Sequence, residues 1–322
     1  MVCLTAAAND DADSHGGTDV AIASLLAHLQ GASYRFVATN RSSHSVVRQR
    51  REAEARHLLR DAFGWVRPFR AGMLPGELEA ALLSGGLISQ GRNDWLVSRI
   101  RVSSVGDLLF VHSPPGANRS AVFLGPDSYR YARFLRQTLT GSPAAGRALD
   151  IGVGAGVGAL TLLRAGLATD VTGSDVNPHA LRLARLNAQH AGLPLKTVQC
   201  SGLPSGPHRY DLIVANPPFI AGQDGAIYRD GGALHGAALS LEWARASLAR
   251  LADGGRFLLY TGAPVVDGTD LVREALEEMT RREGLLLDYD EIDPDIFGSS
   301  LKLDAYRDVE RIAAVGAVVT AC

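Results

Sequence analysis

The chain contains the run Leu149-Asp150-Ile151-Gly152-Val153-Gly154-Ala155-Gly156-Val157-Gly158, which predicts a buried parallel strand, a glycine-rich turn and a helix in succession. Glycines at alternate positions leave one side of the turn without Cβ atoms, and they permit positive φ where the chain reverses. The first N–H groups of the following helix have no partners within the helix, so they also face a ligand in the turn. The run therefore predicts a site for a nucleotide-like cofactor.

Two classes of cofactor suit this turn. The segment 154–159 fits the G-x-G-x-x-G/A pattern of dinucleotide sites, and Asp175 follows at about the expected ~20 residues. A turn that binds S-adenosylmethionine (SAM) would instead carry an acidic residue just before the glycines, and Asp150 fills that place. A carboxylate repels a pyrophosphate, whereas SAM brings an ammonium and a sulfonium and no phosphate. The turn therefore favours SAM.

A second motif lies downstream. The apolar run 210–215 predicts another buried strand, and it ends in Asn216-Pro217-Pro218-Phe219. This ending is similar to the Asn-Pro-Pro-aromatic signature of class I SAM-dependent methyltransferases that act on planar nitrogen. Both motifs follow predicted strands and occur in the family's order, so together they are far more specific than either alone. The resemblance covers roughly residues 120 to 262.

The resemblance implies a fold and a set of cofactor contacts. The fold is an α/β, Rossmann-like methyltransferase sheet of seven strands in which the last two strands pair antiparallel. The cofactor is SAM, and its implied binding residues are Asp150, Gly152, Gly154, Gly156, Asp175, Val176, Asn177, Ser201 and Asn216. Asp175 would accept the ribose hydroxyls, and the two residues after it would flank the adenine. The family often has an acidic residue beyond the third strand, where this chain has Cys200-Ser201, which leaves the adenine contact to Ser201 or to backbone.

The chemistry of nitrogen methylation explains the second motif. An amide or ring amino nitrogen is a poor nucleophile because its lone pair is delocalised. The side-chain oxygen of Asn216 and the carbonyl of Pro217 can accept its N–H protons and aim the lone pair at a methyl group. Two prolines stiffen the loop, and Phe219 can stack on a planar substrate. Because alignment is the main contribution, we expect Asn216, Pro217 and Phe219 to be catalytic without a nucleophilic residue or a metal.

A long glycine-rich loop, residues 220–235, follows the catalytic motif and predicts a substrate lid. The candidate substrate contacts are Pro218, Tyr228, Arg229 and His235. The Tyr-Arg-Asp-Gly-Gly run at 228–232 resembles that of an uncharacterised bacterial branch of Asn-Pro-Pro methyltransferases, whereas the protein-glutamine relatives would carry a glutamate-rich loop. Arg229 could bind an anionic group or pair with a neighbouring aspartate, and His235 could equally be a loop histidine without a role.

The remaining chain divides into a tail and a smaller domain. We predict a disordered tail over residues 1–16, an N-terminal substrate-recognition domain over 17–113 and the methyltransferase domain over 117–322. Helices are predicted over 19–29, 48–63 and 74–83, followed by paired strands over 95–102 and 108–112. This order is typical of a mainly helical, winged-helix-like module. A packing extension that only completes the core is the alternative.

Composition limits the environment and the partners. A net charge of −2, with 46% hydrophobic and 20% charged residues, is typical of a globular protein and gives no strong nucleic-acid signature. The three cysteines show no spacing of a metal site or a disulfide. With neither a signal peptide nor a spanning segment in the sequence, we expect a cytoplasmic protein without membrane contact.

The sequence thus predicts a SAM-dependent N-methyltransferase. The acceptor could be a protein glutamine amide, an RNA base or other nucleobase, or a heteroaromatic or amide-bearing small metabolite, and the modest charge leans slightly away from RNA. One alternative is an NAD-linked oxidoreductase on the same fold. Another is a non-catalytic, SAM-binding partner subunit. The oligomeric state is left open by the sequence.

Overall fold

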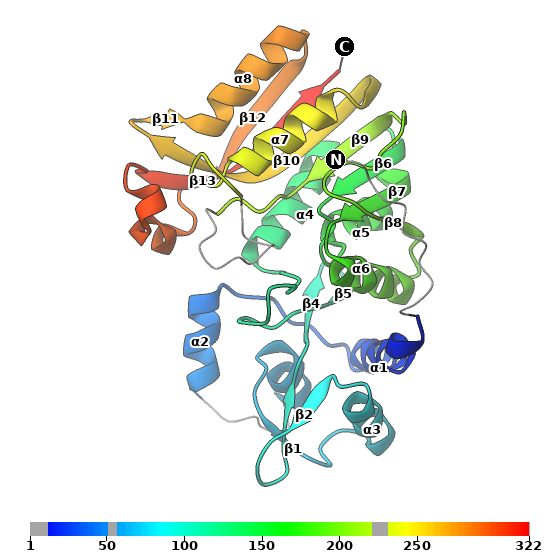
Figure 1. The fold of residues 1–322 in the computed structure, drawn as a ribbon. Helices are drawn as coiled ribbons and strands as arrows, with labels where there is room; N and C mark the ends of the chain where they lie inside the picture. Colours follow the sequence, from blue (N-terminus) through cyan, green and yellow to red (C-terminus); the bar gives the residue numbers. More distant parts are fainter. Residues whose placement is uncertain (1–11, 51–56, 221–230, 322) are drawn as a thin grey trace.

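The computed structural model describes residues 12–50, 57–220 and 231–321 (Figure 1). Its centre is one mixed sheet with the order β12-β13-β10-β9-β6-β7-β8. The strands are β6 (Ala145–Ile151), β7 (Ala168–Asp175), β8 (Leu195–Gln199), β9 (Tyr210–Ala215), β10 (Leu251–Val266), β12 (Leu286–Asp293) and β13 (Arg311–Thr320), and the short β11 (Thr269–Asp270) pairs with β10. The predicted seven-stranded α/β sheet is confirmed, including the antiparallel pairing of β12 with β13.

Helices cover both faces of this sheet (Figure 1). They are α4 (Pro126–Leu139), α5 (Val157–Arg164), α6 (Pro178–Ala191), α7 (Ala238–Leu248) and α8 (Leu271–Glu283). Side chains of β9 alternate between the faces, because Leu212 and Val214 join one buried cluster with α4, whereas Ile213 and Ala215 join another with α7 and α8. A parallel strand that is covered on both faces reads as a continuous apolar run, and this is why β9 was predictable.

The N-terminal part combines helices with two small antiparallel sheets. Its helices are α1 (Ala12–Gly31), α2 (Arg41–Gln49), the π-type turn η2 (Arg60–Gly64) and α3 (Gly76–Ser84). Strands β1 (Phe69–Arg70), β2 (Ile88–Gln90) and β3 (Trp95–Ser98) form a sheet of order β1-β3-β2, and β4 (Arg101–Val105) pairs with β5 (Leu108–His112). The part is mainly helical, as predicted.

Several predicted boundaries in this part were wrong. Helix α1 begins at Ala12, inside the segment expected as a tail, and residues 1–11 lie outside the described structure. A helix was expected over 48–63, but α2 ends at Gln49, and residues 51–56 are not described. The strand expected over 95–102 is two strands in different sheets, because the chain leaves β3 after Ser98 and starts β4 at Arg101.

One buried core joins the N-terminal part to the α/β part. Cluster residues run from α1 through β4 and β5 to α5 and α6. The side chain of Asn187, fully buried on α6, accepts a hydrogen bond from Val111 N at 2.8 Å and donates to Val111 O at 3.1 Å and to Ala155 O at 2.9 Å. On the surface of the same junction, Arg182 forms an ion pair with Asp19 at 2.6 Å. The N-terminal part therefore has a fixed place beside the glycine-rich turn.

Replacing Asn187 by alanine should destabilise the fold by about 2–4 kcal/mol, because several buried backbone groups would lose their partner. Urea unfolding of the full chain measures this loss. Asn118→Ala is the matched control, because this exposed loop asparagine makes one local bond, to Ser120 N at 3.1 Å. A loss of less than about 1 kcal/mol for the Asn187 variant would mean that the junction does not depend on these bonds.

Within the described residues, no helix combines the length and the apolar character needed to cross a bilayer.

Candidate active site

The strand register brings the two sequence motifs together. In the parallel pair β6 and β9, Ile151 lies opposite Ala215, so Gly152 and Asn216 leave the sheet at neighbouring positions. On the other side of β6, Ile151 pairs with Ser174 of β7, and β7 ends one residue later, at Asp175. The carboxyl ends of parallel strands form the ligand crevice in open α/β sheets. The predicted cofactor and catalytic residues therefore share one edge of the sheet.

The glycine-rich turn after β6 has the backbone that its sequence predicts. Gly152, Gly154 and Gly156 have φ values of +68°, +53° and +93°, a region that side chains rarely adopt. A Cβ atom on Gly152 would lie 2.7 Å from the Trp243 ring, whereas a Cβ on Gly154 would meet only the Gly152 carbonyl oxygen, at 3.8 Å. Bare backbone at Gly154 thus faces open space, as a cofactor cradle requires.

Asp150 lies beneath this turn and is 2% exposed. Its Oδ2 accepts a hydrogen bond from Ala159 N at 2.7 Å, and its Oδ1 accepts one from the Tyr131 hydroxyl at 3.1 Å. A Cβ atom on Gly158 would lie 2.7 Å from Asp150 Oδ2, so the close approach depends on that glycine. Burial raises the pKa of Asp150 to about 7, and the two hydrogen bonds oppose the rise. Asp150 anchors the start of α5.

The raised pKa of Asp150 predicts pH-dependent cofactor binding. With a pKa of about 7, the carboxyl is mostly protonated below that pH, and a cationic ligand favours the ionised form. Affinity for SAM should therefore fall as the pH drops below about 7, by up to about tenfold per pH unit. Calorimetric titration between about pH 5 and 7, where the α-ammonium of SAM stays protonated, measures this. Asp150→Asn should flatten the profile, and a flat profile in the unaltered chain would contradict the coupling.

Asp175 connects the turn to the next strand. Its Oδ2 accepts from Gly154 N at 3.0 Å and its Oδ1 accepts from Asn177 N at 2.9 Å. Burial raises the pKa of Asp175, and these backbone bonds oppose the rise. Each carboxylate oxygen keeps a further acceptor site, so the side chain can both hold the cradle and accept ribose hydroxyls.

The three predicted adenine neighbours lie on the loops after β7 and β8. Val176 is 49% exposed, and an exposed apolar side chain at this edge suits an adenine ring. Asn177 is committed elsewhere, because its Oδ1 caps α6 by accepting from His179 N at 3.0 Å and its Nδ2 donates to Ser120 O at 3.0 Å. Ser201 is exposed at the end of β8. The direct adenine contacts stay a prediction.

The Asn-Pro-Pro-Phe motif turns inward after β9. Asn216 and Pro218 are half-buried, and Pro217 is buried. Phe219 is 8% exposed, and its ring lies over Gly262, where a Cβ atom would be 2.5 Å away. It also packs edge-on against Phe297, with ring centroids 5.7 Å apart. Little of the Phe219 ring is therefore exposed, and its stacking on a planar substrate stays a prediction.

The predicted substrate loop is described only in part. Tyr228 and Arg229 lie outside the described residues. His235 Nδ1 donates a hydrogen bond to the Ala305 carbonyl at 2.6 Å, and its Nε2 lies 3.7 Å from a carboxylate oxygen of Asp308. In this structure His235 therefore fastens the end of the loop to the connection between β12 and β13.

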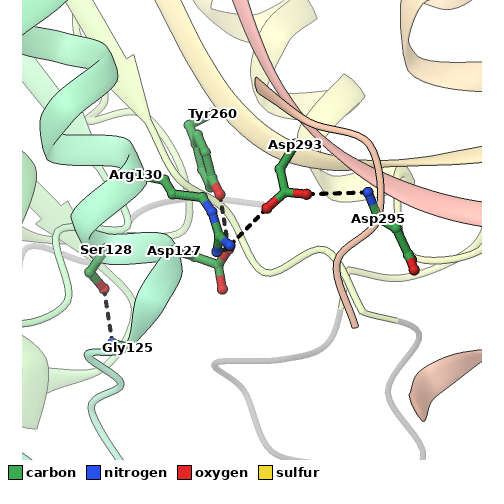
Figure 2. Close-up of polar contacts among 7 residues, drawn as sticks. All are labelled: Gly125, Asp127, Ser128, Arg130, Tyr260, Asp293 and Asp295. Carbon is green, nitrogen blue, oxygen red and sulfur yellow. Dashed lines mark hydrogen bonds and ion pairs between the residues drawn. The ribbon is translucent and has the colours of Figure 1, made fainter. Parts of the chain in front are cut away.

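A polar network that the sequence analysis missed lies beside the motif (Figure 2). The Tyr260 hydroxyl donates a hydrogen bond to Asp127 at 2.9 Å. Tyr260 lies on β10, next to Leu259, which pairs with Ala215 at the end of β9. Arg130 contacts Asp127 at 3.4 Å and Asp293 at 2.8 Å. Burial raises the pKa of Asp127, while Tyr260 and Arg130 oppose the rise. The available signal was a tyrosine at the end of the apolar run 257–260 within β10.

Known proteins share this arrangement of motifs. Residues 118–242 match the family model of the methyltransferase small domain. The release factor glutamine methyltransferase of Deinococcus radiodurans is 46% identical over 82 residues, which are 25% of this chain and 29% of the relative. That of Bordetella pertussis is 33% identical over 148 residues, covering 44% of this chain and 54% of the relative. The ribosomal RNA small subunit methyltransferase C of Pseudomonas entomophila is 38% identical over 88 residues, covering 27% of this chain and 26% of the relative.

The matched segments thus span about half or less of the length of these relatives. The segment that matches the family model contains the glycine-rich turn and the Asn-Pro-Pro-Phe motif, which the strand register places together at one edge of the sheet. The match to the methyltransferase small domain is therefore a match of the segment that carries both motifs.

Proposed function

We propose that this chain is a SAM-dependent methyltransferase that methylates a planar nitrogen. The observation that carries the proposal is the register of β6 and β9, which sets Gly152 of the cradle beside Asn216 of the catalytic motif. The buried carboxylate of Asp150 beneath the turn adds to it, because it would disfavour a pyrophosphate and favour a cationic ligand. The place of Asp175 at the end of β7 supports a contact with the ribose of an adenosyl group.

The residues of the chain bind and align the reactants. When bound, SAM supplies a methyl group carried on a positively charged sulfur. The Asn216 side-chain oxygen and the Pro217 carbonyl accept the N–H groups of the acceptor, so its lone pair faces the cradle. The rigid proline pair holds these two acceptors at a fixed spacing. The acceptor nitrogen would take the methyl group from that sulfur, and the proton that it then loses would pass to solvent. Alignment supplies most of the rate.

The names of the relatives guide the choice of acceptor class. The curated relatives are named for a release factor glutamine and for ribosomal RNA. Accordingly, we propose a protein glutamine amide, an RNA base or a flat small molecule as the acceptor. We also propose that the N-terminal part, residues 17–113, presents the substrate, since Asn187 and the Arg182–Asp19 pair fix it beside the crevice.

Transfer of a labelled methyl group from SAM into a fractionated cell extract tests the proposal. We expect label in one of the protein, RNA or small-molecule fractions, and no label with Asn216→Ala. Calorimetry with SAM and with NADH separates this activity from the oxidoreductase alternative. Binding of NADH without binding of SAM would overturn the proposal, and so would SAM binding with no label in any fraction.

A further inference from the structure

The connection between β12 and β13, residues 294–310, lies at the same edge of the sheet as the active site. Strand β13 runs antiparallel to β10, and its first residue, Arg311, lies opposite Val265 near the carboxyl end of β10. The chain that enters β13 must therefore pass the edge at which Asn216 leaves β9. Figure 1 shows this connection, with the short helices η3 (Gly298–Lys302) and η4 (Asp304–Tyr306), beside the start of β13.

The connection is firmly anchored in the core. Ile296, Tyr306 and Val309 are buried in the cluster that also holds Phe219. Ile296 N donates to the Ile312 carbonyl at 2.7 Å. Three buried apolar anchors and a backbone bond to the sheet therefore hold this connection, which we call the wall, in one place.

Contacts from three parts of the active site meet this wall. The Phe297 ring packs on Phe219 of the catalytic motif at 5.7 Å. The loop after that motif reaches it through the bond from His235 to the Ala305 carbonyl, at 2.6 Å. The start of α4 reaches Asp293, the residue just before the wall, through an ion pair of Arg130 at 2.8 Å, which Figure 2 shows. The wall therefore borders the acceptor side of the site.

Phe297 is the unusual residue of this wall. The residue is 37% exposed although its ring lies against the buried ring of Phe219. Its backbone is left-handed, with φ +57°. This conformation costs free energy for a residue with a Cβ atom, and glycine or asparagine adopts it more readily. The backbone conformation thus does not favour a phenylalanine here, so its presence is explained by the ring. Strained residues of this kind cluster at ligand sites.

We propose that Phe297 is the aromatic platform for the acceptor, and that the acceptor is a flat nitrogen heterocycle such as a nucleobase rather than a glutamine amide. This inference rests on the proposed N-methylation. Phe219 is too enclosed to offer a stacking face, whereas Phe297 meets it at an interplanar angle of 66° and stays partly exposed. The exposed part of Phe297 is therefore the aromatic surface that is left for a flat acceptor beside the motif. A glutamine side chain would cover little of that aromatic surface.

Binding of free guanosine and adenosine to the full chain, saturated with S-adenosylhomocysteine, tests the platform. N-acetylglutamine amide is the comparison ligand, and a short single-stranded RNA shows whether the heterocycle is taken free or within a polymer. Removal of one stacking aromatic ring typically lowers the affinity about tenfold or more. Phe297→Asn should therefore weaken nucleoside binding about tenfold, and Phe297→Tyr should stay within about twofold.

The Asn variant is chosen because asparagine suits left-handed backbone, so its thermal unfolding should stay close to that of the unaltered chain. Both variants should keep the unaltered SAM affinity. Equal nucleoside affinity in Phe297→Asn, or methylation of N-acetylglutamine amide at a rate that Phe297→Asn leaves unchanged, would overturn the platform. The platform would also be overturned if the full chain bound SAM but bound neither the nucleosides nor the RNA. Failure to bind SAM at all would count against the proposed function instead.

Discussion

Asn216→Ala is expected to lower kcat/KM for methyl transfer by about 10²–10³-fold while the affinity for SAM changes little. Asn216 follows β9 at the crevice and is half-buried. Removing its side-chain oxygen takes away one of the two acceptors that align the nitrogen. The loss should appear in kcat as well as in kcat/KM, because the interaction is needed in the transition state. Initial rates with labelled SAM, together with calorimetry, measure both quantities.

Asn93→Gly serves as the matched control for this variant. Asn93 lies in the turn between β2 and β3 and has φ +55°, so glycine fits its backbone. The control should keep the unaltered rate and the unaltered SAM affinity. If Asn216→Ala kept more than about a third of the rate, the amide would have no aligning role. A parallel loss of SAM affinity would instead place Asn216 in the cofactor site alone.

Asp175→Ala is expected to weaken SAM binding about a hundredfold, or about 2.8 kcal/mol. The carboxylate accepts hydrogen bonds from Gly154 N and Asn177 N, so its removal loosens the cradle as well as the ribose contact. Hydrogen bonds to a charged group are stronger than neutral ones, which supports an effect of this size. Equilibrium titration with SAM measures the change.

Asp170→Ala is the matched control on the same strand. Asp170 lies near the opposite end of β7, and its carboxylate pairs with Lys196 at 2.8 Å on the exposed surface. This control should keep the unaltered SAM affinity within about twofold. Equal affinities in the two variants would show that the end of β7 does not hold the cofactor. Thermal unfolding of Asp175→Ala checks that any loss reflects the site and not the fold.

The sequence predicted those elements whose cause lies within a few residues. Strand β9 was expected over 210–215 and forms over Tyr210–Ala215, because its apolar run is bounded by turn residues. The left-handed glycines after β6 were expected from their spacing. By contrast, the strand expected over 95–102 breaks near Arg99, because its two halves pair with different partners. Propensity alone cannot show a change of partner.

The parts of the site that were missed depend on contacts between distant residues. Asp127 follows the cap residue Gly125 of α4 and is buried against Tyr260, which lies 133 residues away. The ring of Phe219 packs against Phe297 from the connection before β13. Neither partner can be found from local spacing, because only the fold brings these segments together.

A crystal structure of the full chain with S-adenosylhomocysteine tests the shared crevice most directly. We predict that the ribose hydroxyls contact Asp175, that the backbone at Gly152 and Gly154 lies against the ligand, and that the sulfur faces Asn216. A ligand bound away from this turn, or a sulfur directed away from Asn216, would contradict methyl transfer at this edge of the sheet.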